Sequence, residues 1–196
     1  MGTRINVILA HTLSDFRDRS ELLRRLHLVD TEAIAVAEYW KSTGQGGELD
    51  SWRFHPHSPG WDEHLVDYDG PGSLFITASR HAIKIRTGGR WRGFLSMPEL
   101  RAVHLAAFRA IGRAFDAAAM VLYPDCDDVD GVFWENGTLQ ECICKLRQVY
   151  GDPQPSIDCI PHAIVLETEH TVPQVWYIDS LVGTYFAEFV PGISSE

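Results

Sequence analysis

The sequence lacks the features that mark membrane proteins and disulfide-rich secreted proteins. No apolar run reaches the ~18 residues of a membrane-spanning helix, and the short apolar run 4–10 is typical of a first strand rather than a signal peptide. The cysteines are few for a chain of 196 residues: Cys126, Cys142, Cys144 and Cys159. They do not form a dense framework, so we interpret them as reduced thiols and expect a cytoplasmic, bacterial-type protein with no membrane contact.

Two catalytic signatures are also missing. The chain contains no glycine-rich phosphate loop and no Gly-x-Ser-x-Gly elbow. Nucleotide binding through such a loop and α/β-hydrolase chemistry therefore have no support. We expect no cofactor, and the sequence favours a binding protein over an enzyme.

Basic residues are scarce in the second half of the chain. Residues 1–100 hold 12 Lys and Arg against 13 Asp and Glu, whereas residues 101–196 hold 5 against 14. An acidic surface repels nucleic-acid backbones and anionic membranes and attracts basic proteins. The charge distribution therefore argues against a nucleic-acid partner and suits a basic protein partner.

The order of predicted elements indicates the fold class. Strand patterns occur at 4–10, 73–77, 82–86, 90–94, 120–123, 163–167, 174–178 and 185–190. Helix patterns occur at 15–28, 32–42, 97–117 and 139–150, with capping boxes at Asp18/Glu21, Ser96/Glu99 and Thr138/Glu141. Runs of adjacent strands between helices predict an α+β fold with a mainly antiparallel sheet covered by helices on one face. We expect a single compact domain, 1–196, with an irregular loop at about 44–72 that its aromatic residues pack down.

A basic hairpin is predicted around the pair Gly88-Gly89. Two glycines between two β-rich runs are typical of a two-residue hairpin turn. Between residues 80 and 92 there is no acidic residue, and the basic residues are Arg80, Lys84, Arg86, Arg90 and Arg92. Basic residues on such a hairpin guard a sheet edge against aggregation, and they are a candidate binding surface.

The most concentrated charge lies in residues 123–131. The acidic residues of this segment and its continuation are Asp125, Asp127, Asp128, Asp130 and Glu135. Crowded carboxylates need a cation or a basic surface nearby. We expect this acidic segment either to be solvated, capping the next helix through the favourable dipole at its N-terminus, or to lie close to the basic hairpin.

A metal site is the alternative. Carboxylates suit hard cations such as Mg²⁺, and His55, His57 and His64 lie in a Pro-rich loop with ligand types that suit zinc. Together with Asp125 and Asp127 they form the candidate metal ligands of a metal-dependent hydrolase or phosphoryl-transfer enzyme. The first hypothesis is a non-enzymatic acidic module that neutralises a basic protein, as an immunity protein does.

Overall fold

The computed structural model describes residues 3–44, 51–56, 64–154, 157–158, 160 and 174–182. These residues form seven strands, six α-helices and one short 3-10 helix, η1 (Pro71–Ser73). The strands are β1 (Arg4–Ala10), β2 (Arg53–His55), β3 (Val66–Gly70), β4 (Leu74–Ala78), β5 (Ala82–Arg90), β6 (Ala119–Pro124) and β7 (Tyr177–Ser180). The helices are α1 (Arg19–His27), α2 (Asp30–Ser42), α3 (Trp91–Ser96), α4 (Pro98–Ala114), α5 (Asp127–Trp134) and α6 (Leu139–Tyr150).

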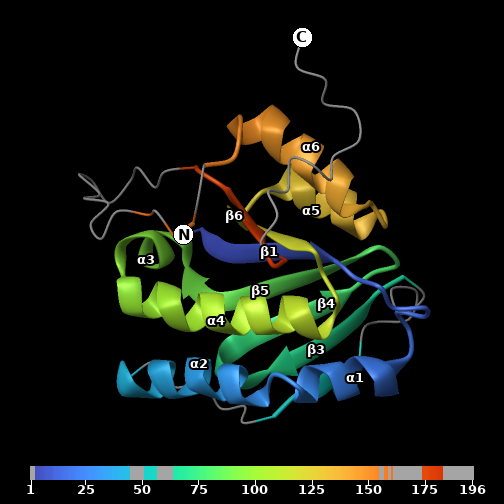
Figure 1. Cartoon of the computed structure of the whole chain (residues 1–196), viewed down its shortest axis with the longest axis vertical. Helices are drawn as coiled ribbons and strands as arrows, with labels where there is room; N and C mark the ends of the chain where they lie inside the picture. The colour runs from blue at the N-terminus through green and yellow to red at the C-terminus, as the bar shows by residue number, and fades with distance from the viewer. Residues whose placement is uncertain are drawn as a thin grey trace.

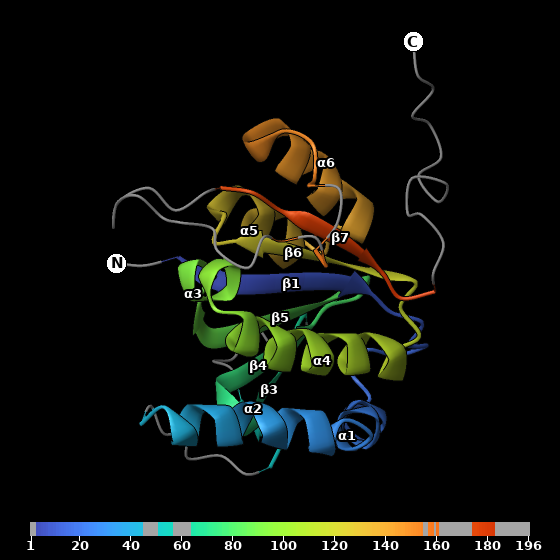
Figure 2. The ribbon, with the colours of Figure 1, turned by 60° about the vertical axis from the view of Figure 1, so that its left-hand side comes forward.

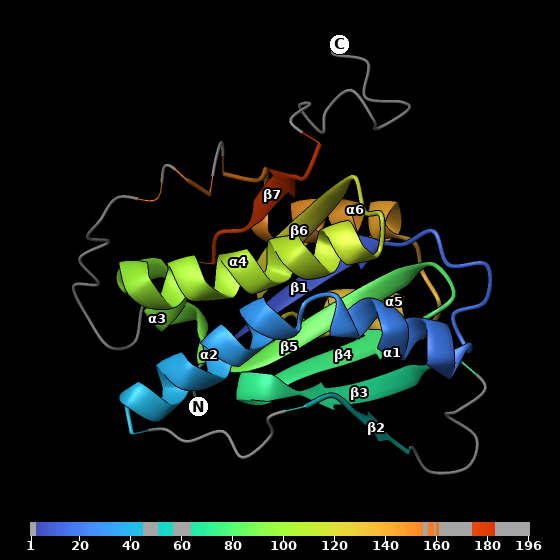
Figure 3. The ribbon, with the colours of Figure 1, turned by 60° about the horizontal axis from the view of Figure 1, so that its bottom comes forward.

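The strands make one sheet in the order β2-β3-β4-β5-β1-β6-β7, and every pairing between neighbours is antiparallel. Figure 3 shows β2 at one edge and β3, β4 and β5 following side by side. The first strand of the sequence lies inside the sheet, because β1 pairs with both β5 and β6. The predicted α+β class, antiparallel sheet and single compact domain are confirmed.

Helices cover both faces of the sheet, where the sequence predicted one. In Figure 1, α4 lies in front of β3, β4 and β5 with α1 and α2 beside it, whereas α5 and α6 lie at the top of the view beside β1 and β6; Figure 2 shows the same two groups of helices. The reason is that β1 and β6 are apolar on both sides. Val7 belongs to the hydrophobic core on the α4 side of the sheet, whereas its neighbour Ile8 belongs to the core on the α5 side, with Phe133. Strands that are apolar on both sides need a helix on each side.

The helix predictions are confirmed where an apolar stripe and a capping signal indicate the same span. α4 and α6 fall on the predicted spans 97–117 and 139–150. The Thr138 side chain accepts a hydrogen bond from Glu141 N, and Glu141 accepts one from Thr138 N at 2.7 Å. Asp18 caps α1 as predicted. The capping box at Ser96 does not form, because the Ser96 hydroxyl donates to the carbonyl of Arg92 in the preceding helix α3.

The prediction of a basic hairpin around Gly88-Gly89 is wrong. β5 runs straight through Gly88 and Gly89, and the chain then turns into α3. A two-residue type I′ turn needs positive φ at both central residues, and neither glycine is among the residues with positive φ. Gly89 serves a close approach instead: a Cβ built on it would lie 2.9 Å from Ile5 Cδ1 of β1. The basic residues therefore lie along one strand and its ends, and the true hairpin joins β4 to β5.

The irregular loop predicted at about 44–72 contains more structure than expected. Its second part forms β3, which pairs with β2 and β4. Trp52 packs down as predicted: it is 5% exposed and its indole N–H donates to Asp30 at 3.0 Å. A Cβ on Gly70 would collide with the Trp52 ring at 2.2 Å, so glycine at 70 makes room for that ring.

Part of the predicted C-terminal strands lies outside the described residues, namely 163–167 and 185–190. The strand predicted at 174–178 is observed slightly later, as β7. Its Asp179 accepts two hydrogen bonds from Arg109 of α4, at 2.7 and 3.1 Å, which fastens the edge strand to the helix layer. Among the described helices, none combines the length and the apolar character required to cross a membrane.

Candidate functional site

The acidic segment forms the junction between β6 and α5. Asp127, Asp128 and Asp130 occupy the first turn of α5, where negative charge is favoured by the helix dipole. Asp125 precedes the helix and turns back to β1: its Oδ2 accepts from Arg4 N and its Oδ1 from the Asn6 amide, both at 2.8 Å. The predicted place at a helix N-terminus is therefore observed, but no carboxylate caps the helix: the N-cap residue is Cys126, and no side chain makes a cap hydrogen bond there.

Asp130 forms an ion pair with Lys84, which brings the acidic segment against β5 as the second expectation proposed. The Lys84 side chain is 0% exposed and that of Asp130 is 28% exposed. The Tyr123 hydroxyl donates to the same carboxylate at 3.4 Å, and the Trp134 ring centre lies 5.8 Å from Lys84 Nζ. The cation that Asp130 faces is therefore Lys84 of the protein itself.

Burial governs the protonation of this cluster. Desolvation lowers the pKa of Lys84, and the neighbouring Asp130 charge partly offsets this. Burial raises the pKa of Tyr123 well above its ordinary value and raises that of Cys142 to about 12. Tyr123 and Cys142 therefore stay neutral at physiological pH and cannot act as bases or nucleophiles there.

Other carboxylates of the segment remain exposed on the α5–α6 layer. Asp128 lies 3.7 Å from Lys145 with 61% of its side chain exposed. Asp127 and Glu135 are exposed and have no ion-pair partner within the described part of the chain. Residues 125–152 carry seven acidic and two basic side chains, which leaves a formal charge of −5 on this layer.

The candidate metal ligands are not brought together. Both oxygens of Asp125 are already hydrogen-bonded, and His55 Nδ1 lies 2.9 Å from Asp69, across the β2–β3 pairing. His64 lies two residues before β3 and is exposed, whereas His57 falls outside the described residues. Over the ranges that the structure describes, no three His, Cys, Asp or Glu side chains are grouped to hold a metal ion.

The predicted basic residues are spread over both ends of the sheet. Arg80 lies in the β4–β5 turn, whereas Arg90 ends β5 opposite Arg4 of β1. Arg86 is half-buried in mid-strand and Arg92 lies in α3. Lys84 is the one that meets the acidic segment.

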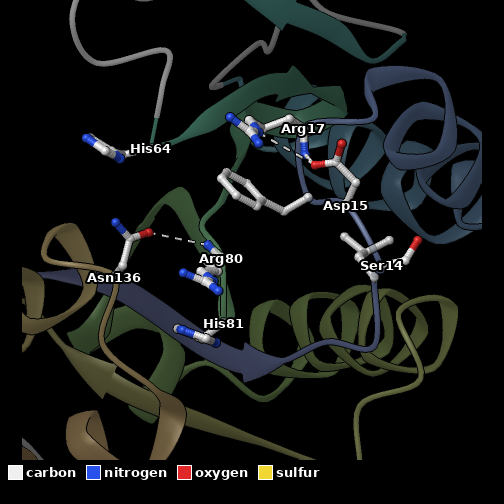
Figure 4. A pocket seen from close by; sticks show the side chains of 9 residues that line it. Ser14, Asp15, Arg17, His64, Arg80, His81 and Asn136 are labelled. Carbon is white, nitrogen blue, oxygen red and sulfur yellow. Dashed lines mark hydrogen bonds and ion pairs between the residues drawn. The ribbon is translucent and has the colours of Figure 1, made fainter.

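The sequence did not indicate an open pocket of about 920 Å³ at the end of the sheet away from Asp125. Four connections meet there: the β1–α1 segment, the segment before β3 that contains His64, the β4–β5 turn and the α5–α6 turn. Its lining residues are Leu13, Ser14, Asp15, Phe16, Arg17, His64, Arg80, His81 and Asn136. In Figure 4, Asn136, Arg80 and His81 lie on one side, and Arg17, Asp15 and Ser14 lie on the other. The feature that the sequence offered was the pair Arg80-His81 after a strand, which the hairpin prediction assigned to the wrong turn.

No family model, curated protein or solved structure matches this chain. Function therefore has to be argued from the residues themselves.

Proposed function

We propose that the chain is a non-enzymatic binding module whose α5–α6 layer takes up a basic protein and neutralises it, in the manner of an immunity protein. The supporting observation is the group of exposed carboxylates on α5 and at its C-cap residue Glu135, of which Asp127 and Glu135 have no cationic partner among the described residues. Unpaired carboxylates held on a rigid helix attract and orient a basic surface without new ordering of the chain.

The buried pair beneath α5 supports the same proposal. Lys84 neutralises Asp130 from within, so the helix that carries the exposed acids is anchored to the central strand of the sheet. Of the candidate metal carboxylates, Asp125 already accepts two hydrogen bonds from the protein, and the described residues place no group of His, Cys, Asp or Glu around Asp127 that could hold a metal ion. The binding hypothesis is therefore better supported than the hydrolase or phosphoryl-transfer alternative.

A bacterial cytoplasm is the setting that we propose. Cys126, Cys142 and Cys144 are free thiols, which suits a reducing compartment. A basic nuclease toxin is the partner class that this charge fits, because such enzymes carry the basic surface that binds nucleic acid.

The experiment measures binding to a panel of purified basic nuclease domains by titration calorimetry at low and raised salt. We expect a partner whose binding weakens with salt and weakens about tenfold when Asp127→Asn is combined with Glu135→Gln. The matched control combines Glu38→Gln with Glu99→Gln, which removes the same charge from exposed sites on α2 and α4. Equal losses in the two double variants would show that net charge, rather than the α5 surface, directs binding.

A further inference from the structure

We propose that the pocket at the β4–β5 turn binds a small molecule that carries a phosphate group. This proposal does not depend on the proposed function, because it uses none of the carboxylates of the acidic layer. Asp125 adjoins Arg4 and Pro124 at one end of the sheet, whereas Arg80 and His81 lie beyond Ala82, which pairs with Ala10 at the other. The two surfaces approach each other at Glu135, which directly precedes the pocket residue Asn136.

Basic side chains dominate the described lining of the pocket. Among the described residues, two arginines and two histidines line it, against the single carboxylate of Asp15, in a chain whose formal net charge is −10. Arg80 and His81 have no carboxylate partner in the described part of the chain. His81 does lie close enough to Glu141 to lower the pKa of that carboxyl, but the larger causes are the hydrogen bonds within the Thr138 cap. The Arg80 guanidinium and the His81 ring, which lack a carboxylate partner among the described residues, make an anion the fitting ligand.

The carboxylate of Asp15 does not cancel this charge. Its Oδ1 accepts a hydrogen bond from Arg17 N at 2.9 Å and lies 3.6 Å from Arg17 Nε, so it is engaged with its own turn. Arg80, His81 and His64 remain for a ligand. Three such donors exceed what a monoanionic carboxylate needs, and they suit the several oxygens of a phosphate dianion.

Hydrogen bonds with Asn136 and His11 hold the β4–β5 turn that carries Arg80. Asn136 follows the C-cap residue of α5 and adopts the left-handed conformation, with φ 61°. Gly137 N donates to Val132 O at 2.8 Å, as at many helix C-termini. The Asn136 side chain accepts from Arg80 N at 3.4 Å. His11 Nε2 contacts Ser79 O at 2.9 Å on the other side of the same turn. A turn held at both ends presents its cations with little loss of freedom on binding.

The size and walls of the pocket indicate a small molecule rather than a free ion. A volume of about 920 Å³ lies in the range of small-molecule sites, roughly 300–1,000 Å³. Leu13 and Phe16, both half-buried, supply an apolar wall beside the cations. Such a wall accommodates the body of a phosphorylated nucleoside or sugar while the phosphate meets Arg80.

The test titrates the full chain with inorganic phosphate, adenosine monophosphate and a hexose phosphate, each organic ester beside its unphosphorylated parent, by calorimetry. We expect the phosphorylated probes to bind and their parents to fail, and the stronger of the two esters identifies a nucleotide or a sugar body. Arg80→Gln, alone or with His81→Gln, should weaken binding roughly tenfold or more. Asp15→Asn should strengthen it, because a carboxylate facing the phosphate is removed.

The matched control is Arg113→Gln, an exposed arginine in the last turn of α4, outside the pocket lining, with the same change of charge. It should bind the esters as the unaltered protein does. Unchanged melting temperatures of the Arg80 and His81 variants, which alter exposed side chains, would show that folding is intact. No binding of any phosphorylated probe at millimolar concentration, or equal binding by Arg80→Gln and Arg113→Gln, would overturn the proposal.

Discussion

Lys84 on the central strand β5 and Asp130 in the first turn of α5 form an ion pair across the interface between the sheet and its upper helical layer, and the Lys84 side chain is completely buried. A buried pair is costly to break on one side only, because the remaining charge has no water to solvate it. The pair therefore fixes where α5 sits on the sheet more than it adds to net stability.

A double-mutant cycle on this pair should show coupling. Asp130→Asn leaves the enclosed ammonium without its counter-charge, so we expect it to lower the free energy of unfolding by about 3–5 kcal/mol. Lys84→Met leaves Asp130 near solvent and should cost less. The double variant should resemble Lys84→Met alone, so the coupling should equal the cost of Asp130→Asn, about 3–5 kcal/mol. Urea unfolding followed by tryptophan fluorescence measures all four proteins; strictly additive losses would mean that the pair is not coupled.

Acid should destabilise the fold through His104. This side chain is 0% exposed, its Nδ1 lies 2.8 Å from Leu100 O and its Nε2 lies 3.3 Å from Thr87 Oγ1. The Leu100 carbonyl can only accept, so Nδ1 carries the proton, and in the neutral ring Nε2 accepts from the Thr87 hydroxyl, whose oxygen accepts from Gly89 N. Burial lowers the pKa of His104 from 6.5 to about 4.

The sign of the effect follows from which state binds more protons. Between pH 6.5 and about 4 the unfolded chain protonates His104 while the folded chain does not, so stability falls as pH falls through this window. We expect a loss of about 3 kcal/mol. Denaturant unfolding at a series of pH values measures it. His104→Gln should flatten the slope in this window, leaving the smaller contribution of His11, whose pKa burial also lowers; an unchanged slope would exclude His104 as the source.

Two serine and threonine positions with the same sequence signature should differ in stability. Thr138→Ala removes a capping box that forms, so we expect it to lower the free energy of unfolding by about 1 kcal/mol. Ser96→Ala removes a hydroxyl that only donates to a carbonyl within α3 and should cost less than ~0.5 kcal/mol. Thermal and urea unfolding of the two variants, side by side, checks the difference. Equal costs would mean that Ser96 caps α4 in solution.

Arg109 should control the attachment of β7. Its guanidinium donates two hydrogen bonds to Asp179, a carboxylate with 10% of its side chain exposed, and this carboxylate raises the pKa of Arg109. Removing them by Arg109→Gln should weaken β7 by about 1.5–3 kcal/mol. Hydrogen exchange should therefore speed up at Tyr177–Ser180 while protection in β1 and β5 is unchanged. The exposed Arg113→Gln is the control, and a uniform loss of protection would point to global destabilisation instead.

Local patterns were sufficient where a residue's role is set by its near neighbours. The apolar stripe of α4 and the Thr138/Glu141 box both identify helices from residues three or four apart. Gly88 and Gly89 show the limit. A pair of glycines is the same in sequence whether it allows a turn or the close passage of another strand, and only the position of Ile5 on β1 distinguishes the two.

The site required contacts that no local pattern contains. Charge alone predicted that the acidic segment would meet the basic residues, and Lys84 and Asp130 confirm it. Which lysine and which aspartate meet depends on α5 beginning at Asp127, because that start turns Asp130 toward β5. The pocket joins residues from four separate connections, so the sequence could give its members but not their assembly.

The position of β1 carries a kinetic consequence. Val7 pairs with Ile85 on one side and with Leu122 on the other, so β1 can gain its first neighbour only when β5 is present and its second only when β6 is present. Contacts so distant in sequence close slowly. We therefore expect β1 to gain protection from hydrogen exchange late in refolding, after the sequence-local pairings of β3, β4 and β5 have formed.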